Sequence, residues 1–187
     1  IESYISLSAN HYSSCMAIQS LAVIFEKLSK AVISGNIHLL QEIHKSASIS
    51  GVAIATTDVG LGSIISRSIS EAFSLPRGIV DSIVLNHVIT FNAGKRSETA
   101  KSLAKLSEVL GLIHFEASPE EKIQAILNKI NQIKESLLLP KSLTDLHSAL
   151  VNYKVKGWFE PNNTNVPDTI IGTSEIMAGN NHCHQTH

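Results

Sequence analysis

Apolar and polar residues alternate along most of this chain with the three- and four-residue spacing of amphipathic helices. The apolar residues of the first such segment are Met16, Ile18, Leu21, Ala22, Ile24, Phe25, Leu28 and Val32. This spacing predicts a helix with one buried face, which ends at the helix stop Gly35-Asn36. A second helix is predicted from Ile37 to Ile54, and the small residues in its second half would let a neighbouring helix approach closely.

The middle of the chain combines a glycine hinge, a proline turn and a long apolar segment. After Gly60-Leu61-Gly62 the pattern predicts a short helix that stops before Pro76. The residues from Ile79 to Asn92 are apolar on nearly every side, which predicts a helix in the centre of the domain. Asp58 precedes the hinge, and we expect it to cap the hinge helix.

Three further helices are predicted after this segment. Residues 95–110 carry one apolar and one charged face, and Gly111 stops that helix. Ser118-Pro119-Glu120-Glu121 places Ser at the N-cap, Pro at the first helical position and Glu at the third, as in a capping box. The helix that starts there is expected to run through Ile133, and a short helix follows over residues 143–151.

The pattern changes beyond Tyr153, where loop-forming residues replace the helical period. The sole strand candidate, residues 166–171, is short. We therefore expect an all-α bundle of about seven helices over residues 1–153, followed by an irregular C-terminal extension over residues 154–187. His182-Cys183-His184 and His187 could capture zinc or nickel, but this polar terminus lacks the rigid frame of a functional metal site.

Composition limits the classes of function. Hydrophobic residues make up 43% and charged residues 17% of the 187 residues, which is typical of a packed domain. The net charge of −1 gives no electrostatic basis for binding nucleic acid or an anionic membrane. No apolar run approaches the roughly 20 residues of a membrane span, and without a basic segment followed by an apolar one we expect no secretory signal. Cys15 and Cys183 are far apart, which favours a reducing, cytoplasmic location over a structural disulfide.

Several segments together resemble the iron-containing alcohol dehydrogenase family. Residues 58–62 are similar to its Asn-Ala-Gly-Leu-Gly segment, Leu75-Pro76-Arg77-Gly78 resembles its Leu-Pro-His-Gly turn, and residues 84–92 end in Phe-Asn as the family's apolar helix does. Ile1-Glu2-Ser3-Tyr4 resembles the family's Ile-Glu-x-Tyr segment. The resemblance covers about residues 1–110. It implies the family's C-terminal helical domain, a bundle of the dehydroquinate-synthase-like kind.

The resemblance implies a two-part enzyme. An N-terminal half binds NAD(P), and the helical half holds a divalent metal, iron or zinc, that polarises the alcohol oxygen. The nucleotide-binding half is absent from this chain, so we expect no cofactor-binding residues here. That half would be a partner in the same parent or a separate chain, and a homodimer is a further candidate assembly.

The metal ligands that the resemblance implies are substituted in this chain. The family's first hinge-helix histidine falls on Ile65, its second on Ile69, and the histidine of the proline turn on Arg77. Isoleucine has no donor atom, and a guanidinium stays cationic and repels a divalent ion. The upstream Asp and His of the family's ligand set would lie before Ile1. We therefore expect no metal site of the usual kind in this chain.

Three residues near the expected cleft are candidates for chemistry. Arg77 could anchor a carboxylate or phosphate, although a turn arginine that reaches solvent, Asp81 or Glu71 is the simpler interpretation. For Asp58 an N-cap role is favoured over acid–base chemistry. For His87 a packed, hydrogen-bonded histidine is favoured over a proton relay. Gly60 and Gly62 lack the full dinucleotide fingerprint.

Two functions follow from this interpretation. The first is the helical half of an alcohol-dehydrogenase-like oxidoreductase, inactive by itself, which predicts an exposed apolar face on the first helices where the other half docks. The alternative is a degenerate, non-catalytic family member that acts as a binding or assembly module. A metal-independent oxidoreductase that uses Arg77 lies between them.

Overall fold

The computed structural model describes residues 1–58 and 60–146, and these residues form helices without any strand. The helices are α1 (Glu2–Ile5), α2 (His11–Ser34), α3 (Ile37–Ala55), α4 (Leu61–Phe73), α5 (Arg77–Lys95), α6 (Ser97–Val109) and α7 (Pro119–Ser136). A further helical turn begins over residues 143–146. The predicted all-α bundle is confirmed. The extension predicted over residues 154–187 lies outside the described residues.

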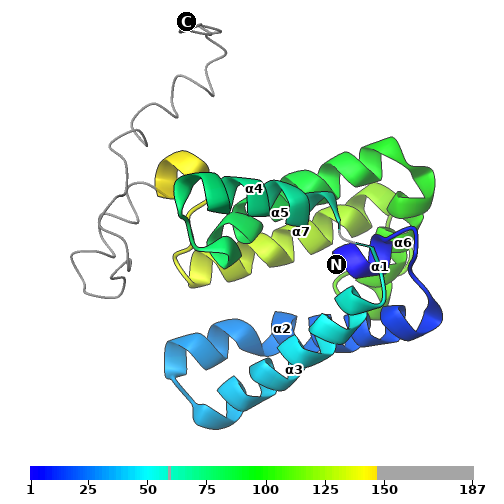
Figure 1. Cartoon of the computed structure of the whole chain (residues 1–187). Helices are drawn as coiled ribbons and strands as arrows, with labels where there is room; N and C mark the ends of the chain where they lie inside the picture. Colours follow the sequence, from blue (N-terminus) through cyan, green and yellow to red (C-terminus); the bar gives the residue numbers. More distant parts are fainter. Residues whose placement is uncertain (59, 147–187) are drawn as a thin grey trace, which may run out of the picture.

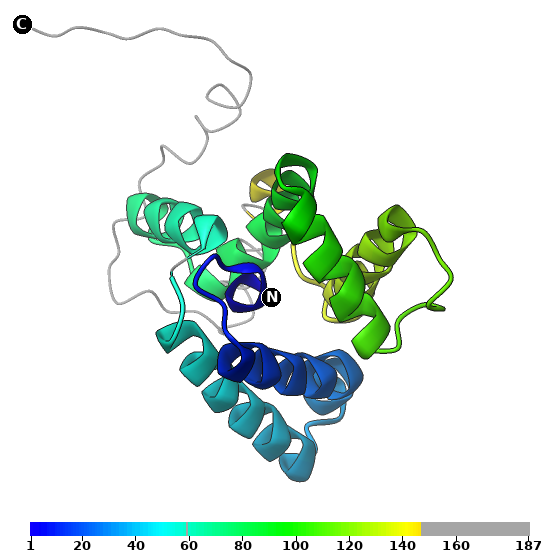
Figure 2. The ribbon, with the colours of Figure 1, turned by 90° about the vertical axis from the view of Figure 1, so that its right-hand side faces the viewer.

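The helices form two groups with α1 between them. The hairpin of α2 and α3 makes one group, and α4 to α7 make the other (Figure 1). The short helix α1, which the sequence pattern did not predict, contacts α2, α3 and α6. Seen from the side, α1 lies above the α2–α3 hairpin and below α4 and α5 (Figure 2). The two groups also meet where α2 packs against α7.

Local sequence signals set the ends of α2 and α3. The Asn10 side chain accepts a hydrogen bond from the backbone N–H of Ser13, and the Ser13 hydroxyl accepts one from the backbone N–H of Asn10, which completes a capping box. Gly35 ends α2 with a left-handed φ of +62°, which glycine adopts at little cost. The side chain of Asn36 then caps α3. The predicted stop at Gly35-Asn36 is confirmed.

Two buried serines hold α2 against α3. The Ser20 hydroxyl donates to the backbone oxygen of Ser46 at 2.9 Å, and the Ser46 hydroxyl donates to the backbone oxygen of Ser20, also at 2.9 Å. Both residues are at most 2% exposed. The small side chains of Ser20 and Ser46 therefore allow the two helices to approach closely. The close approach was predicted further along the helix, where Gly51 is exposed and a Cβ would meet nothing within 4 Å.

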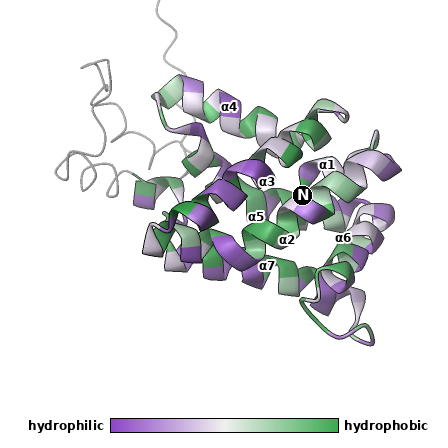
Figure 3. Cartoon of the chain, turned by 90° about the horizontal axis from the view of Figure 1, so that it is seen from below, coloured by the Kyte–Doolittle hydropathy of each residue, from purple (hydrophilic) through white to green (hydrophobic). Residues whose placement is uncertain are grey.

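The hydrophobic core has two parts. The larger joins four helices through Leu21, Phe25, Ile89, Leu103, Leu106, Ile126 and Ile130. The smaller lies between α4, α5 and the turn at residues 143–146, around Val80, Ile83, Val84, Val88 and Leu146. Helix α5 contributes to both parts and contacts α4, α6 and α7, which confirms its predicted central position. Hydrophobic and hydrophilic residues are interleaved along the helices, as expected for helices with one buried face (Figure 3).

The predicted end of the central helix at Asn92 is wrong. Helix α5 runs through Lys95, and Arg96, with φ −141° and ψ 116°, separates it from α6. The extra turn continues because the backbone N–H of Arg96 donates to the carbonyl of Asn92. The Lys95 ammonium lies 5.8 Å from the centre of the Phe91 ring on this turn, a cation–π contact that supports the extension.

The helix signals after the central helix act as predicted. Ser118 and Glu121 form both hydrogen bonds of the capping box at the start of α7. Gly111 has a left-handed φ of +64° directly after α6. Asp145 donates its backbone N–H to the Ser142 hydroxyl at the predicted start of the next helix. Within the described part of the chain, no helix has both the length and the hydropathy of a membrane span.

Candidate functional site

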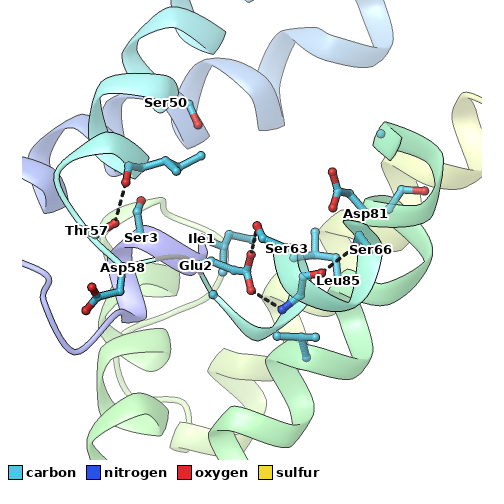
Figure 4. Close-up of a pocket in the computed structure, with 16 residues that line it drawn as sticks. Ile1, Glu2, Ser3, Ser50, Thr57, Asp58, Ser63, Ser66, Asp81 and Leu85 are labelled. Carbon is cyan, nitrogen blue, oxygen red and sulfur yellow. Dashed lines mark hydrogen bonds between the residues drawn. The ribbon is translucent and has the colours of Figure 1, made fainter. Parts of the chain in front are cut away.

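A cavity of about 330 Å³ opens between α1, the end of α3, α4 and α5. Figure 4 shows the side chains that line it. The polar ones come from segments far apart in the sequence, and they include Glu2, Thr57, Asp58, Ser63, Ser66 and Asp81. Asp58 and Asp81 lie on opposite sides of the cavity (Figure 4). The glycine hinge and the start of the central helix thus meet at one hollow.

Glu2 organises one wall of this cavity. Its carboxylate accepts the backbone N–H of Gly62 at 2.8 Å and the hydroxyl of Ser63 at 3.0 Å (Figure 4). Helix α4 has Gly60 at its N-cap, which supplies no side-chain hydrogen bond. The carboxylate therefore serves as the cap of α4 and complements the positive end of the helix dipole. No local spacing could reveal this role, because the two segments are sixty residues apart.

The prediction that Asp58 caps the hinge helix is wrong. Asp58 lines the cavity but is exposed, and its carboxylate accepts a hydrogen bond from the Ser8 hydroxyl. The helix begins two residues later than that prediction requires, and Glu2 already accepts the N–H that a capping side chain would use. Asp58 instead joins the segment before α2 to the segment after α3.

Arg77 is the first residue of α5 and lies one turn before Asp81. Its Nε is 3.7 Å from an Asp81 carboxylate oxygen, and both side chains are close to half exposed. Asp81 lines the cavity, whereas Arg77 is absent from its lining. The arginine thus contacts one of the two acids expected of a turn arginine, and its use as an anion anchor stays a prediction.

The prediction that His87 packs into the core is wrong. It is exposed, whereas its neighbour Val88 is buried at 3% exposure. His87 follows Ile83 and Val84 by one turn on the same side of α5, so its direction on the helix does not explain its exposure. The smaller core covers this side of α5 up to Val84, whereas Phe91, one turn beyond His87, is exposed as well. The helix is therefore buried on this side in its first half and not in its second.

Ile65 and Ile69, at the family's histidine positions, pack against the smaller hydrophobic core. The cavity is lined instead by Gly62, Ser63 and Ser66 on another side of α4. The residues present do not fit a divalent metal, because isoleucine has no donor atom and the Arg77 guanidinium is a cation. Within residues 1–58 and 60–146, no three His, Cys, Asp or Glu side chains gather in a metal-binding group. The histidine-rich terminus lies outside the described residues.

A second cavity of about 370 Å³ adjoins the first and extends between α2, α5 and α7. Residues lining both cavities include Ile1, Ser3, Ser50, Gly78, Ser82 and Leu85. The two hollows therefore share a wall, and more polar side chains line the one at α4 than the one at α7.

Comparison with known proteins places this architecture in one family. The model of the Fe-containing alcohol dehydrogenase family, C-terminal part, matches residues 1–149. The chain is 28% identical over 141 residues to 1-propanol dehydrogenase PduQ of Salmonella typhimurium, covering 75% of this chain and 38% of that protein.

Two solved structures share the fold. A crystal structure of 1,3-propanediol oxidoreductase matches with a TM-score of 0.72 and 21% identity over 78% of this chain and 38% of that one. An iron-containing alcohol dehydrogenase from Thermococcus thioreducens matches with a TM-score of 0.64 and 24% identity, over 75% of this chain and 34% of that one. The chain therefore spans about two fifths or less of the length of each of these relatives.

Proposed function

This chain belongs to the Fe-containing alcohol dehydrogenase family as its C-terminal helical domain, and from this premise we propose that its parent protein is an oxidoreductase that interconverts alcohols and aldehydes with NAD(P). The observation that carries the proposal is the family match over residues 1–149. Because the chain spans 38% of the 1-propanol dehydrogenase that it resembles, the proposal assigns cofactor binding to a nucleotide-binding half outside this chain. The chain is then inactive by itself, and the active protein is cytoplasmic.

The cavity at α4 is the proposed substrate side. In alcohol oxidation a hydride leaves the carbinol carbon for the nicotinamide, and the hydroxyl proton leaves for a base. Besides Glu2, the carboxylates that line the cavity are those of Asp58 and Asp81. In a metal-independent route one of them would accept the proton, and Arg77 would hold Asp81 in position through their ion pair. No step of this route passes through a metal, since the residues present do not fit one.

Exposed apolar residues support a docking surface for the nucleotide-binding half. Those in the segment before α2, at the start of α2, in the second half of α3 and in the first half of α4 are Leu7, Tyr12, Val52, Ile54, Leu61 and Ile64, which are 41–77% exposed. The hydrogen bond between Ser8 and Asp58 joins two of the segments that carry them. Large exposed apolar patches mark interaction sites in soluble proteins. The same surface would serve a homodimer, which is the competing occupant.

The function is tested with the parent protein and with this chain side by side. Alcohol-dependent reduction of NAD and NADP is measured with a series of short primary alcohols, and the reverse reaction with the matching aldehydes. The proposal predicts turnover by the parent and none by the chain alone. Asp81→Asn in the parent should reduce kcat while the exposed control Glu98→Gln leaves it unchanged, since Glu98 lies on α6 and is 72% exposed. A parent without turnover on any of these substrates contradicts the proposal.

The alternative is a degenerate family member that acts as a binding or assembly module. The observation that favours it is the packing of Ile65 and Ile69 into a hydrophobic core, together with Arg77 at the third position. One such change could retune a metal site, but three remove its donors. The metal content of the parent, measured by mass spectrometry, distinguishes the oxidoreductase from the non-catalytic module when it is combined with the activity assay. Stoichiometric iron or zinc together with turnover eliminates the alternative.

A further inference from the structure

Lys134 is a buried cation on the last turn of α7. Its residue is 6% exposed, and it lines the cavity of about 370 Å³ between α2, α5 and α7. Lysine is almost never buried to this extent unless it is paired. A buried ammonium therefore calls for an explanation in terms of its partners.

The partners of Lys134 within residues 1–58 and 60–146 are neutral. Its ammonium donates to the Asn86 side-chain oxygen at 3.3 Å, and the Asn86 amide donates in turn to Asn131 at 2.7 Å. The neighbouring acid Glu135 is engaged elsewhere, in an ion pair with Lys141 at 2.9 Å. No carboxylate of the described segments forms an ion pair with Lys134. Burial accordingly lowers the pKa of Lys134 below its usual range.

The walls of the cavity are mostly apolar with a few serines, and Lys134 is the charged side chain among the described residues that line it. On the α2 side they include Leu21, Ile24 and Phe25, and on the α7 side Ile130 and Ile133. An ammonium in such surroundings gives up part of its hydration without gaining a counter-charge, which is costly. A ligand that brings an anion to the ammonium and an aliphatic chain to the walls would offset that cost.

We propose that this cavity binds a short- to medium-chain aliphatic carboxylate, with its carboxylate on the Lys134 ammonium and its chain along the apolar walls formed by α2 and α7. The volume lies near the lower end of the roughly 300–1,000 Å³ of small-molecule sites, which suits a chain of a few carbons. The two N–H groups of the Lys134 ammonium that do not bond to Asn86 can donate hydrogen bonds to a carboxylate. This site does not depend on the proposed dehydrogenase function.

The site is tested by calorimetric titration of the full chain with hexanoate. Saturable binding is expected, and hexanol, which has the same chain without the charge, should bind at least about tenfold more weakly. Acetate should be weaker again, by about fourfold for each methylene group removed. Both comparisons use the unmodified chain, so they do not depend on how any variant folds. Equal binding of hexanoate and hexanol, or no saturable binding of hexanoate, overturns the proposal.

Variants then test the role of the ammonium. Lys134→Met keeps most of the side-chain volume without the charge, and should lose at least about tenfold in hexanoate affinity. Lys134→Arg keeps the charge and should retain binding. Lys101→Met is the matched control, because Lys101 is 72% exposed and lies on α6. If Lys134→Met is folded by circular dichroism and binds hexanoate like the unmodified chain, the proposal is wrong.

Discussion

The cap that Glu2 supplies to α4 predicts a specific energetic coupling with Gly60. The backbone at Gly60 has φ −74° and ψ 164°, which any residue can adopt. A Cβ at this position would collide with the Glu2 carboxylate and would lie 3.0 Å from Glu2 Cβ. The carboxylate could swing away, but the Cβ of Glu2 cannot. Glycine is therefore required at position 60 by the approach of Glu2 and not by the local conformation.

Gly60→Ala should reduce the free energy of unfolding by about 2 kcal/mol, within the ~1–3 kcal/mol typical of overpacking. Glu2→Ala should cost a similar amount, about 2 kcal/mol, since it removes two charged hydrogen bonds and the cap of α4. The alanine at position 60 already displaces the carboxylate, so the second change has little left to remove. The double variant should therefore fall short of the sum by about 1–2 kcal/mol.

Urea unfolding of the four proteins, followed by far-ultraviolet circular dichroism, gives each free energy. Gly51→Ala is the matched control, because a Cβ there meets nothing within 4 Å. Within α3 it should stabilise the chain by about 0.5–1 kcal/mol. Effects of Gly60→Ala and Glu2→Ala that add to within about 0.5 kcal/mol would refute the proposed contact.

Other variants test the remaining contacts. Ser46→Leu should lower the free energy of unfolding by about 1–3 kcal/mol or more, since the larger side chain forces α2 and α3 apart. An unchanged Tm in scanning calorimetry would contradict this. The hydrogen bond from Lys122 lowers the pKa of Glu108, so the stability it adds is present above the unfolded pKa of about 4.3 and is lost as pH falls through the lower folded pKa. Lys122→Met should therefore flatten the acid limb of the stability–pH curve, and an unaltered limb would contradict this. Arg77→Ala should change the free energy of unfolding by less than about 0.5 kcal/mol because its ion pair is exposed, and a loss above about 1 kcal/mol would show a structural role.

Local signals in the sequence determined most of the fold. The capping box at Ser118, the stops at Gly35 and Gly111 and the apolar spacing of the helices each depend on residues within one or two turns. Helix α1 was missed because four residues carry too little periodicity to be recognised. The end of α5 was misplaced by three residues, because the helix continues through Gly94, although glycine often marks a helix end, and Arg96 breaks it without glycine or proline.

The candidate site was less predictable because its contacts are long-range. Asp58 has a side chain suited to an N-cap, but the cap of α4 is supplied by Glu2, which is sixty residues before Gly62 in the sequence. His87 lies on the same side of α5 as the buried Val84, yet it is exposed because the smaller core does not extend to it. The side of α4 that carries Ile65 faces a core and the side that carries Ser66 faces the cavity. Which side of a helix meets which neighbour is set by tertiary packing, and sequence periodicity alone leaves it open.

Alcohol-dependent reduction of NAD(P) by the parent protein, measured beside this chain alone, is the most direct test of the proposed function. In the proposed function, this helical domain holds the substrate in the cavity at α4, and the parent supplies a nucleotide-binding half. The account predicts turnover by the parent, none by the isolated chain, and a lower kcat in the parent carrying Asp81→Asn. A purified, folded parent that turns over neither alcohols nor aldehydes with either cofactor would contradict it and favour the non-catalytic module.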